Sequence, residues 1–354
     1  MKMSNLIEPL LQTDAMLITD PYNMRYLSGF RGGEGILYIS GKSHVLITDS
    51  RYTEAASKES TYKVEEESRN RRREEILASY IRGEKIRTLG FEDLHMKCAA
   101  YQKLRDAMPE GLRFIPLGGS VNALREIKSE GEIQLLARAE QIGDEAFSDL
   151  LGVLHAGMTE REVAAELEYR MKKRGAQGFS FDTIAASGPN SSMPHAIPTD
   201  RKLADGDFLT LDFGCLYEGY CSDMTRTIAI GNVSNRQKEI YHTVLAAQNA
   251  ALQGLHAGMT GEAGDALARD VIRKAGYGDC FGHALGHSVG LYIHEEPRLG
   301  PGSRVILKKG MIETVEPGIY VPGFCGVRIE DMVVITDDGV IDLTHSPKEL
   351  IVIG

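Results

Sequence analysis

The chain has 354 residues, a formal net charge of −10, 42% hydrophobic residues and 25% charged residues. This composition is typical of a soluble globular protein with a sizeable core, and the length suggests two domains. The negative charge argues against nucleic acid or an anionic membrane as a partner, and no segment approaches the roughly 18 apolar residues of a membrane span, so we expect a cytoplasmic protein.

Residues 1–126 are predicted to form a smaller α/β domain. Short apolar runs between turn residues predict five strands, and two longer amphipathic stretches predict helices. The predicted strands are 15–19, 35–40, 44–48, 88–91 and 113–117, and the predicted helices are 76–81 and 99–108. Alternation of this kind favours a layered α/β arrangement. We find no motif in this region that carries chemistry.

A second domain, residues 127–354, is predicted to open with a long amphipathic helix over 130–154. This domain contains an internal repeat, because the six residues Leu-His-Ala-Gly-Met-Thr occur at 154–159 and again at 255–260. We expect each copy to end one helix at its glycine and to begin another at its threonine. In the first copy, Thr159 and Glu162 have the spacing of a capping box.

The likeness between the two copies continues downstream, where Asp212 matches Glu316 at a nearly constant offset. Each of these acids follows an apolar run. Farther on, Ser-Asp-Met at 222–224 resembles Glu-Asp-Met at 330–332, which puts a second pair of acids at roughly matching places. Internal repeats usually mean related structural units. Two similar halves packed face to face would bring their matching strand ends to one centre.

Five residues of the second domain are candidate metal ligands: Asp212, Asp223, His287, Glu316 and Glu330. A carboxylate beside a buried strand is costly unless a cation or hydrogen bonds compensate it, and four such acids would repel one another. Oxygen ligands with an imidazole suit a pair of divalent cations, namely Mn, Co, Fe or Zn. The five cysteines contain no Cys-x-x-Cys pair, so reduced buried thiols are favoured over thiolate ligands.

Histidines are dense in this part of the chain. His283 and His287 have the spacing of a zinc-protease helix, but Ala284 replaces the glutamate of that motif and nearby glycines disfavour a helix. We expect a strand from His287, with His294 facing away from it. His195 lies in a turn-rich loop, and loops often supply binding groups.

These stretches resemble the pita-bread metallopeptidases, the family of Xaa-Pro dipeptidases (prolidases), Xaa-Pro aminopeptidases and methionine aminopeptidases. The matching segments in the second domain are 212–214, 220–227, 282–287, 294–297, 316–320 and 326–331. Residues 23–30 resemble the creatinase-type N-terminal domain, which methionine aminopeptidases lack, so the Xaa-Pro branch is favoured. The resemblance implies an α+β protein, with a C-terminal pita-bread domain of internal pseudo-two-fold symmetry behind a smaller α/β creatinase-type domain.

The resemblance also implies a role for each ligand. Asp212 would chelate one metal, Asp223 and Glu330 would bridge two metals, and His287 and Glu316 would complete the second. A hydroxide between the metals would attack the carbonyl before proline. Mn or Co is the preferred metal, with Zn or Fe as alternatives. The family further implies a homodimer that acts on short proline-containing peptides.

The remaining candidate residues would act on the substrate. Glu316 would move a proton to the leaving nitrogen, and His195 and His294 would hold the substrate and stabilise the tetrahedral oxygen. His283 would line the pocket and assist, and Arg298 is a candidate contact for a substrate carboxylate. Ala284 and Ser288 stand where many relatives carry glycine, and we expect little change in pocket shape.

Other functions are compatible with this fold. One is a non-catalytic peptide-binding module, although such modules lack the ligands that this chain retains. Another is a metal-free, creatinase-like amidinohydrolase. Within the Xaa-Pro branch, the sequence leaves open whether the enzyme is a dipeptidase or an aminopeptidase.

Overall fold

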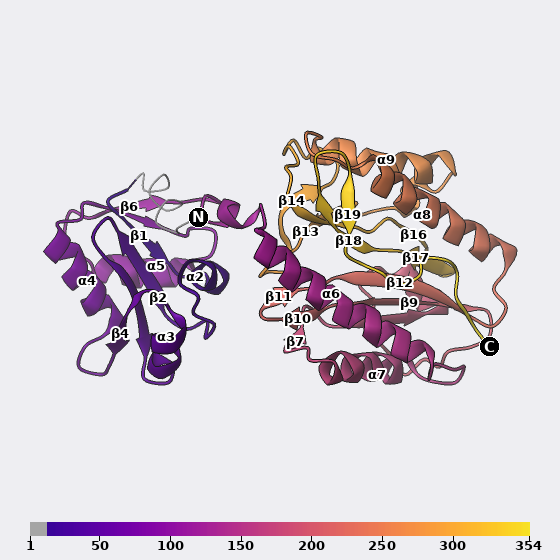
Figure 1. The fold of residues 1–354 in the computed structure, drawn as a ribbon, viewed down its shortest axis with the longest axis horizontal. Coiled ribbons are helices and arrows are strands. Elements are labelled where there is room, and N and C mark those ends of the chain that lie inside the picture. The colour runs from indigo at the N-terminus through magenta and orange to yellow at the C-terminus, as the bar shows by residue number, and fades with distance from the viewer. Residues whose placement is uncertain (1–12) are drawn as a thin grey trace. The chain divides into compact units, whose positions relative to one another are not determined.

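The computed structural model describes residues 13–354, which divide into two compact units at the junction between Arg125 and Glu126 (Figure 1). The first 12 residues of the predicted domain 1–126 lie outside the described residues. Each unit has its own apolar core and is described by itself.

The first unit is a six-stranded mixed sheet with helices on both faces, in the strand order β4-β3-β2-β1-β5-β6. Strand alternation sends Leu17 and Met16 of β1 into two different buried clusters, so both faces of the sheet are covered. The strands are β1 (Ala15–Ile18), β2 (Ile36–Ser40), β3 (His44–Asp49), β4 (Lys63–Glu67), β5 (Thr88–Phe91) and β6 (Arg113–Pro116). The helices are α2 (Pro21–Ser28), α3 (Thr53–Glu59), α4 (Arg73–Glu84) and α5 (Cys98–Ala107), followed by the 3₁₀ turn η2 (Asn122–Arg125).

The predicted α/β layering of this unit is confirmed, but the prediction missed α2, α3 and β4. Both helices are short, with eight and seven residues, so they show little apolar periodicity. The strand β4 reads Lys-Val-Glu-Glu-Glu, which has a low strand propensity and forms only because it pairs in parallel with β3 at the sheet edge.

The second unit consists of two similar halves, each with a helix pair and a sheet. In the first half, α6 (Glu130–Leu151) and α7 (Glu160–Lys173) accompany β8 (Ile184–Ser187), β9 (Asp207–Phe213), β12 (Met224–Ile230) and β20 (Val352–Ile353). In the second half, α8 (Asn235–Gly254) and α9 (Gly261–Lys274) accompany β13 (Gly286–Ser288), β14 (Glu295–Leu299), β15 (Ile312–Val315), β18 (Asp331–Ile335) and β19 (Val340–Asp342). Figure 1 shows the helix pairs on opposite sides of the strands. The predicted pseudo-two-fold α+β domain is therefore confirmed.

Short elements complete the unit. They are β7 (Gly178–Phe179), β10 (Cys215–Tyr217), β11 (Tyr220–Cys221), β16 (Gly318–Val321) and β17 (Cys325–Arg328), with the 3₁₀ turns η3 (Gly188–Ser192) and η4 (Gly278–Cys280). None of the five cysteines forms a disulfide, as predicted, although Cys98 is exposed rather than buried. Among residues 13–354, no helix has both the length and the apolar character that crossing a membrane requires.

Strand alternation explains why the matched acids face inward. Leu211 and Phe213 of β9 pack in the core under α6 and α7, so Asp212 between them projects from the opposite face. Val315 of β15 packs in the core under α8 and α9, so Glu316 likewise follows onto the inner face. The two helix-covered faces turn outward, and the inner faces of the two halves meet.

The repeat differs from the prediction at its helix ends. The helices α6 and α8 end at Leu151 and Gly254, several residues before the repeated glycines. Those glycines, Gly157 and Gly258, have φ angles of 95° and 94° in turns where their N–H groups bond to neighbouring segments. The predicted helix starts are confirmed, because Thr159 caps α7 in a capping box with Glu162 and Thr260 caps α9.

The second pair of acids matches less closely than the sequence suggested. In the first half, Asp212 of β9 pairs with Thr225 of β12. In the second half, the last pair of β15 and β18 is Val315 with Asp331, so the next residues, Glu316 and Glu330, lie opposite each other. Glu330 therefore occupies the position of Thr225, and the position of Asp223 is taken by Arg328 in the second half. Thr225 and Glu330 form an isolated bridge with each other, which places the pseudo-two-fold axis between them.

Candidate metal centre

All nine predicted site residues line one cavity of about 490 Å³ in the second unit. They are Asp212, Asp223, His287, Glu316, Glu330, His195, His283, His294 and Arg298. The cavity wall also contains residues that the sequence analysis did not select, among them Phe181, Ile184, Ile197 and Arg328.

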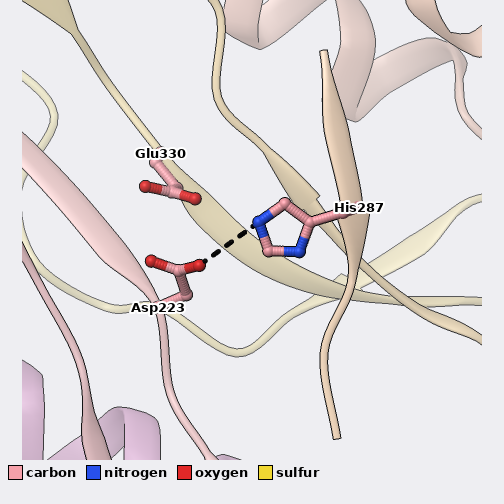
Figure 2. A group of neighbouring side chains, drawn as sticks. All are labelled: Asp223, His287 and Glu330. Atoms are coloured by element: carbon pink, nitrogen blue, oxygen red, sulfur yellow. Dashed lines mark ion pairs between the residues drawn. The ribbon is translucent and has the colours of Figure 1, made fainter. Parts of the chain in front are cut away.

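Asp223, His287 and Glu330 form the tightest group of potential ligands (Figure 2). Each of the three offers one ligand atom, and these atoms all lie within 4.8 Å of one another. His287 Nε2 lies 3.5 Å from Asp223 Oδ2 and 3.6 Å from Glu316 Oε1. Asp223 lies just before β12, His287 is the middle residue of β13 and Glu330 lies just before β18, so both halves of the repeat contribute to the group.

The orientation of His287 presents a lone pair to the acids. Its Nδ1 lies 3.1 Å from the carbonyl oxygen of Ser288, which can only accept a hydrogen bond, so Nδ1 carries the proton. Burial lowers the pKa of His287 to about 3, and the imidazole is therefore neutral at physiological pH. A neutral imidazole whose Nδ1 is held by a carbonyl is the form in which histidine binds metals.

Burial and mutual repulsion raise the pKa values of three acids in the cavity. Burial, followed by the charges of Glu330 and Asp212, raises the pKa of Asp223 well above its ordinary value. Burial and the charge of Glu316 raise the pKa of Glu330 in the same direction. The pKa of Glu316 is raised to about 8, mainly by burial. In the metal-free protein these groups therefore bind protons more tightly than free carboxyls do, and a divalent cation would compete with those protons.

One acid has a cationic partner that the sequence analysis did not assign. The buried guanidinium of Arg328 lies 2.5 Å from Asp212 Oδ2 and also donates to the hydroxyls of Thr225 and Tyr320, at 3.0 and 2.7 Å. An arginine inside the buried strand β17 is the signal that could have revealed this role. Arg328 forms an ion pair with Asp212, and its charge also opposes the raised pKa values of Glu316 and Glu330.

The donor set fits divalent metal ions. Within residues 13–354, Asp212 Oδ1 is buried and has no hydrogen-bond partner, which leaves one oxygen of this acid available. One oxygen each of Glu330 and Glu316 is oriented by a hydroxyl, because Thr225 donates to Glu330 Oε2 at 2.6 Å and Thr314 donates to Glu316 Oε1 at 3.1 Å. Carboxylates with one imidazole suit hard or borderline divalent cations.

The predicted orientation of His294 is wrong. The strand expected from His287 ends at Ser288, and the chain turns back where Gly290 N–H bonds to the carbonyl of Tyr292. This turn brings the His294 ring to 4.6 Å from the His287 ring, centroid to centroid, so His294 lies beside the ligand group. The register of β13 and β14 also shifts between His287 and Ser288.

His283 belongs to a hydrogen-bonded row that ends at Asp212. Its Nδ1 lies 2.8 Å from the carbonyl oxygen of Ala284, so this nitrogen donates, and Nε2 accepts from the Tyr320 hydroxyl at 2.9 Å. Tyr320 in turn accepts from Arg328. Burial and the charge of Arg328 lower the pKa of His283 to about 4, so its ring stays neutral.

The other two candidates lie at the cavity mouth. His195 is exposed on the loop after η3, beside the exposed Ile197. Arg298 lies on β14, with its Nε 3.5 Å from Glu296 Oε1 and half of its side chain exposed. Both side chains line the cavity. No contact between them and Asp223, His287 or Glu330 is found within residues 13–354, so they are placed to bind substrate rather than metal.

Comparison with known proteins gives a consistent result over both units. The family model "Metallopeptidase family M24" matches residues 134–337, and the model "Creatinase/Prolidase N-terminal domain" matches residues 11–127. The chain is 45% identical over 353 residues to an uncharacterized peptidase, YqhT, of Bacillus subtilis, and the match covers 99% of each chain.

Solved structures extend this likeness. A Xaa-Pro dipeptidase from Bacillus anthracis superposes with a TM-score of 0.95 at 43% identity, covering 99% of this chain and 100% of the other. An X-Pro aminopeptidase from Thermotoga maritima superposes with a TM-score of 0.91 at 40% identity, covering 98% and 99%. Proteins named for two related activities are thus about equally similar to this chain.

Proposed function

Because this chain belongs to metallopeptidase family M24, we propose that its cavity holds two divalent metal ions and that it hydrolyses the peptide bond before proline in short peptides. The observation that carries this proposal is the buried group of Asp223, His287 and Glu330, with Glu316 3.6 Å from His287. Family membership implies divalent metal, whereas the number of ions, their identity and the substrate belong to the proposal. Mn or Co is our preferred metal.

Each ligand has a place in the proposed centre. Asp212 would help to hold metal through the oxygen that Arg328 leaves unpaired, and His287 and Glu316 would be further ligands. Asp223 and Glu330, the two acids next to the pseudo-two-fold axis, would be ligands placed between these groups. When bound, the two cations lower the pKa of water and polarise the substrate carbonyl.

The chain's own groups would complete the reaction. Glu316, whose pKa is raised by burial, accepts the proton of the attacking water and passes it to the leaving proline nitrogen. His294, beside His287, and His195 at the mouth bind the substrate carbonyl oxygen as negative charge develops on it. His283 is held by Tyr320 and supports this wall of the cavity.

Groups at the cavity mouth would select the substrate. Arg298 is exposed enough to contact a carboxylate on the product side of the bond. The apolar side chains of Phe181, Ile184 and Ile197 offer a surface for a proline ring. A dipeptide carries its carboxylate on the proline itself, whereas a longer peptide carries it farther away. The distance at which Arg298 can contact a carboxylate would therefore help to determine whether the enzyme acts as a dipeptidase or an aminopeptidase.

The proposal is tested by peptide hydrolysis with controlled metal. Chelator-treated protein, reloaded with Mn²⁺ or Co²⁺, is incubated with Xaa-Pro dipeptides, Xaa-Pro-Yaa tripeptides and matched peptides with alanine in place of proline. We expect cleavage before proline only, only after metal is added, and lost in Asp223→Asn. Binding without cleavage would favour a peptide-binding module, and metal-independent turnover of a guanidino compound would favour an amidinohydrolase.

Two further properties belong to the same proposal. We propose a homodimer, as the family implies, which light scattering of the purified protein tests directly. We also propose a cytoplasmic location, which the free state of all five cysteines supports.

A further inference from the structure

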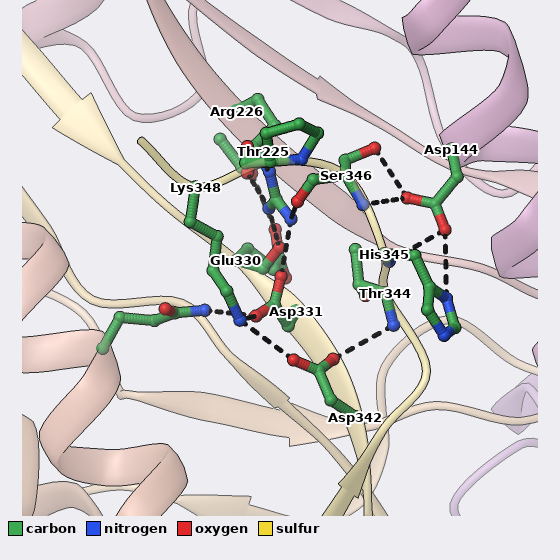
Figure 3. Close-up of polar contacts among 12 residues, drawn as sticks. Asp144, Thr225, Arg226, Glu330, Asp331, Asp342, Thr344, His345, Ser346 and Lys348 are labelled. Carbon is green, nitrogen blue, oxygen red and sulfur yellow. Dashed lines mark hydrogen bonds and ion pairs between the residues drawn. The ribbon is translucent and has the colours of Figure 1, made fainter. Parts of the chain in front are cut away.

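The segment 342–348, which begins at the last residue of β19, is hydrogen-bonded to residues around the proposed ligands Asp223 and Glu330, and Figure 3 shows it beside Arg226 and Glu330. None of the residues 342–348 lines the cavity. The segment is nevertheless tied to both acids through side chains that the proposed reaction does not use.

Arg226 makes the first connection. Its side chain is almost completely buried, with 1% exposed, and its guanidinium donates to Glu330 O at 2.7 Å and to Asp331 Oδ1 at 2.8 Å. The same guanidinium donates to the carbonyl oxygens of Ser346 and Pro347, at 2.8 and 3.0 Å. Arg226 therefore joins the backbone of a proposed ligand to segment 342–348, through hydrogen bonds that its charge strengthens.

Thr344 makes the second connection. Its hydroxyl donates to Glu140 Oε1 at 2.7 Å and accepts from the Met332 N–H at 3.0 Å. The other oxygen of Glu140 accepts from the Asp223 N–H at 3.3 Å. Glu140 is fully buried in α6, so Thr344 orients a carboxyl that holds the backbone of Asp223 from behind.

We propose that segment 342–348 is a positioning element for the metal centre, in which Arg226 and Thr344 hold the two acids at a fixed separation. This inference rests on the proposed function. Asp223 and Glu330 must both become charged at short range when cations replace their protons, and groups that fix their backbones reduce the reorganisation that binding requires. Groups behind metal ligands commonly change metal affinity 10–100-fold when they are removed.

The same segment supplies a matched control. Ser346 donates its hydroxyl to Asp144 Oδ1 at 2.6 Å, and its N–H bonds to the same oxygen at 2.7 Å. Asp144 lies in α6 like Glu140, but within residues 13–354 no hydrogen bond joins the side chain of Ser346 or Asp144 to Asp223 or Glu330. Loss of the Ser346 hydroxyl therefore loosens the segment without releasing the hydroxyl bond that orients Glu140.

The test compares Thr344→Val with Ser346→Ala, each of which removes one hydroxyl from the segment. Chelator-treated protein is titrated with Mn²⁺ in a calorimeter, and the unfolding temperature of the metal-free form is recorded. We expect Thr344→Val to weaken Mn²⁺ binding roughly 10-fold and to lower kcat at unchanged KM. We expect Ser346→Ala to keep the wild-type Mn²⁺ affinity within about twofold. We expect the same of Thr344→Ser, because both variants retain a hydroxyl at position 344.

Equal affinities in Thr344→Val and Ser346→Ala would overturn the inference while leaving the proposed function intact. A wild-type protein that binds no Mn²⁺ would instead overturn the proposed function. Hydrogen exchange of the wild type gives a second reading that needs no variant. Because coupling is reciprocal, added Mn²⁺ should slow exchange at the amides of 344–346, and unchanged exchange there would also overturn the inference.

Discussion

Glu313 of β15 provides a quantitative test of the electrostatics of the second unit. Its side chain is completely buried, and neither carboxyl oxygen has a hydrogen-bond partner among residues 13–354. The nearest cation, Lys128, bonds instead to Ser288 Oγ at 2.8 Å and to Glu295 Oε2 at 3.2 Å. Burial raises the pKa of Glu313 well above its ordinary value, with Lys128 opposing the change, so burial favours the protonated carboxyl.

The sign of the pH dependence follows from this protonation. In the unfolded chain Glu313 ionises near pH 4.3, whereas in the folded protein it keeps its proton to a much higher pH. Its contribution to stability is therefore present at low pH and is lost as the pH rises toward the folded pKa. One proton costs about 1.4 kcal/mol for each pH unit between the unfolded and the folded pKa, which is the largest slope that Glu313 alone can give.

The variant Glu313→Gln keeps the shape of the side chain and cannot ionise. We expect its stability relative to wild type to rise with pH between pH 5.5 and 7.5, with a slope of at most about 1.4 kcal/mol per pH unit, measured by urea unfolding of metal-free protein. Other buried acids, such as Glu140 and Glu316, contribute equally to both proteins and cancel in the difference. Glu349→Gln removes an exposed acid and serves as the control. Parallel pH profiles for wild type and Glu313→Gln would refute the reasoning.

Three further predictions follow from buried or metal-linked groups. Lys128→Met breaks the buried ion pair of Lys128 with Glu295, whose side chains are 1% and 4% exposed, and should cost about 3–5 kcal/mol by urea unfolding, whereas a double change that also replaces Glu295 by leucine should recover much of it. Adding Mn²⁺ at 100 times its dissociation constant should stabilise chelator-treated protein by about 2.7 kcal/mol, and an unchanged unfolding temperature would contradict the proposed centre. Tyr320→Phe removes the bond from the tyrosine hydroxyl to His283 and the bond from Arg328, and should lower kcat about 10-fold with metal content retained; full activity would contradict the support assigned to His283.

The parts of the centre that sequence could predict are those with a local cause. Asp212 and Glu316 each end an apolar run, and strand alternation alone places them on the face opposite the helix-covered core. Thr159 and Thr260 are helix caps whose spacing is readable within a few residues. The family resemblance supplied the roles, and its family assignment is confirmed by the match over residues 134–337.

The parts that could not be predicted depend on contacts between distant segments. Arg328 reaches Asp212 across 116 residues of sequence, and only the assembled halves bring them together. The position of His294 is set by a turn at Gly290 and by a register shift beside His287, neither of which has a pattern in the sequence. Aligning Ser-Asp-Met at 222–224 with Glu-Asp-Met at 330–332 paired Asp223 with Asp331. The strand register instead makes Arg328 the equivalent of Asp223 in the second half.

The most direct test of the account is the amount of divalent metal held per chain. Wild type and Asp223→Asn are loaded with Mn²⁺ and freed of excess metal. The manganese bound per chain is then measured by inductively coupled plasma mass spectrometry. The account predicts about two equivalents in wild type, as in two-metal hydrolytic sites, and most of this lost in Asp223→Asn. Wild type without bound metal, or equal metal content in the two proteins, would contradict a centre built around Asp223 and Glu330.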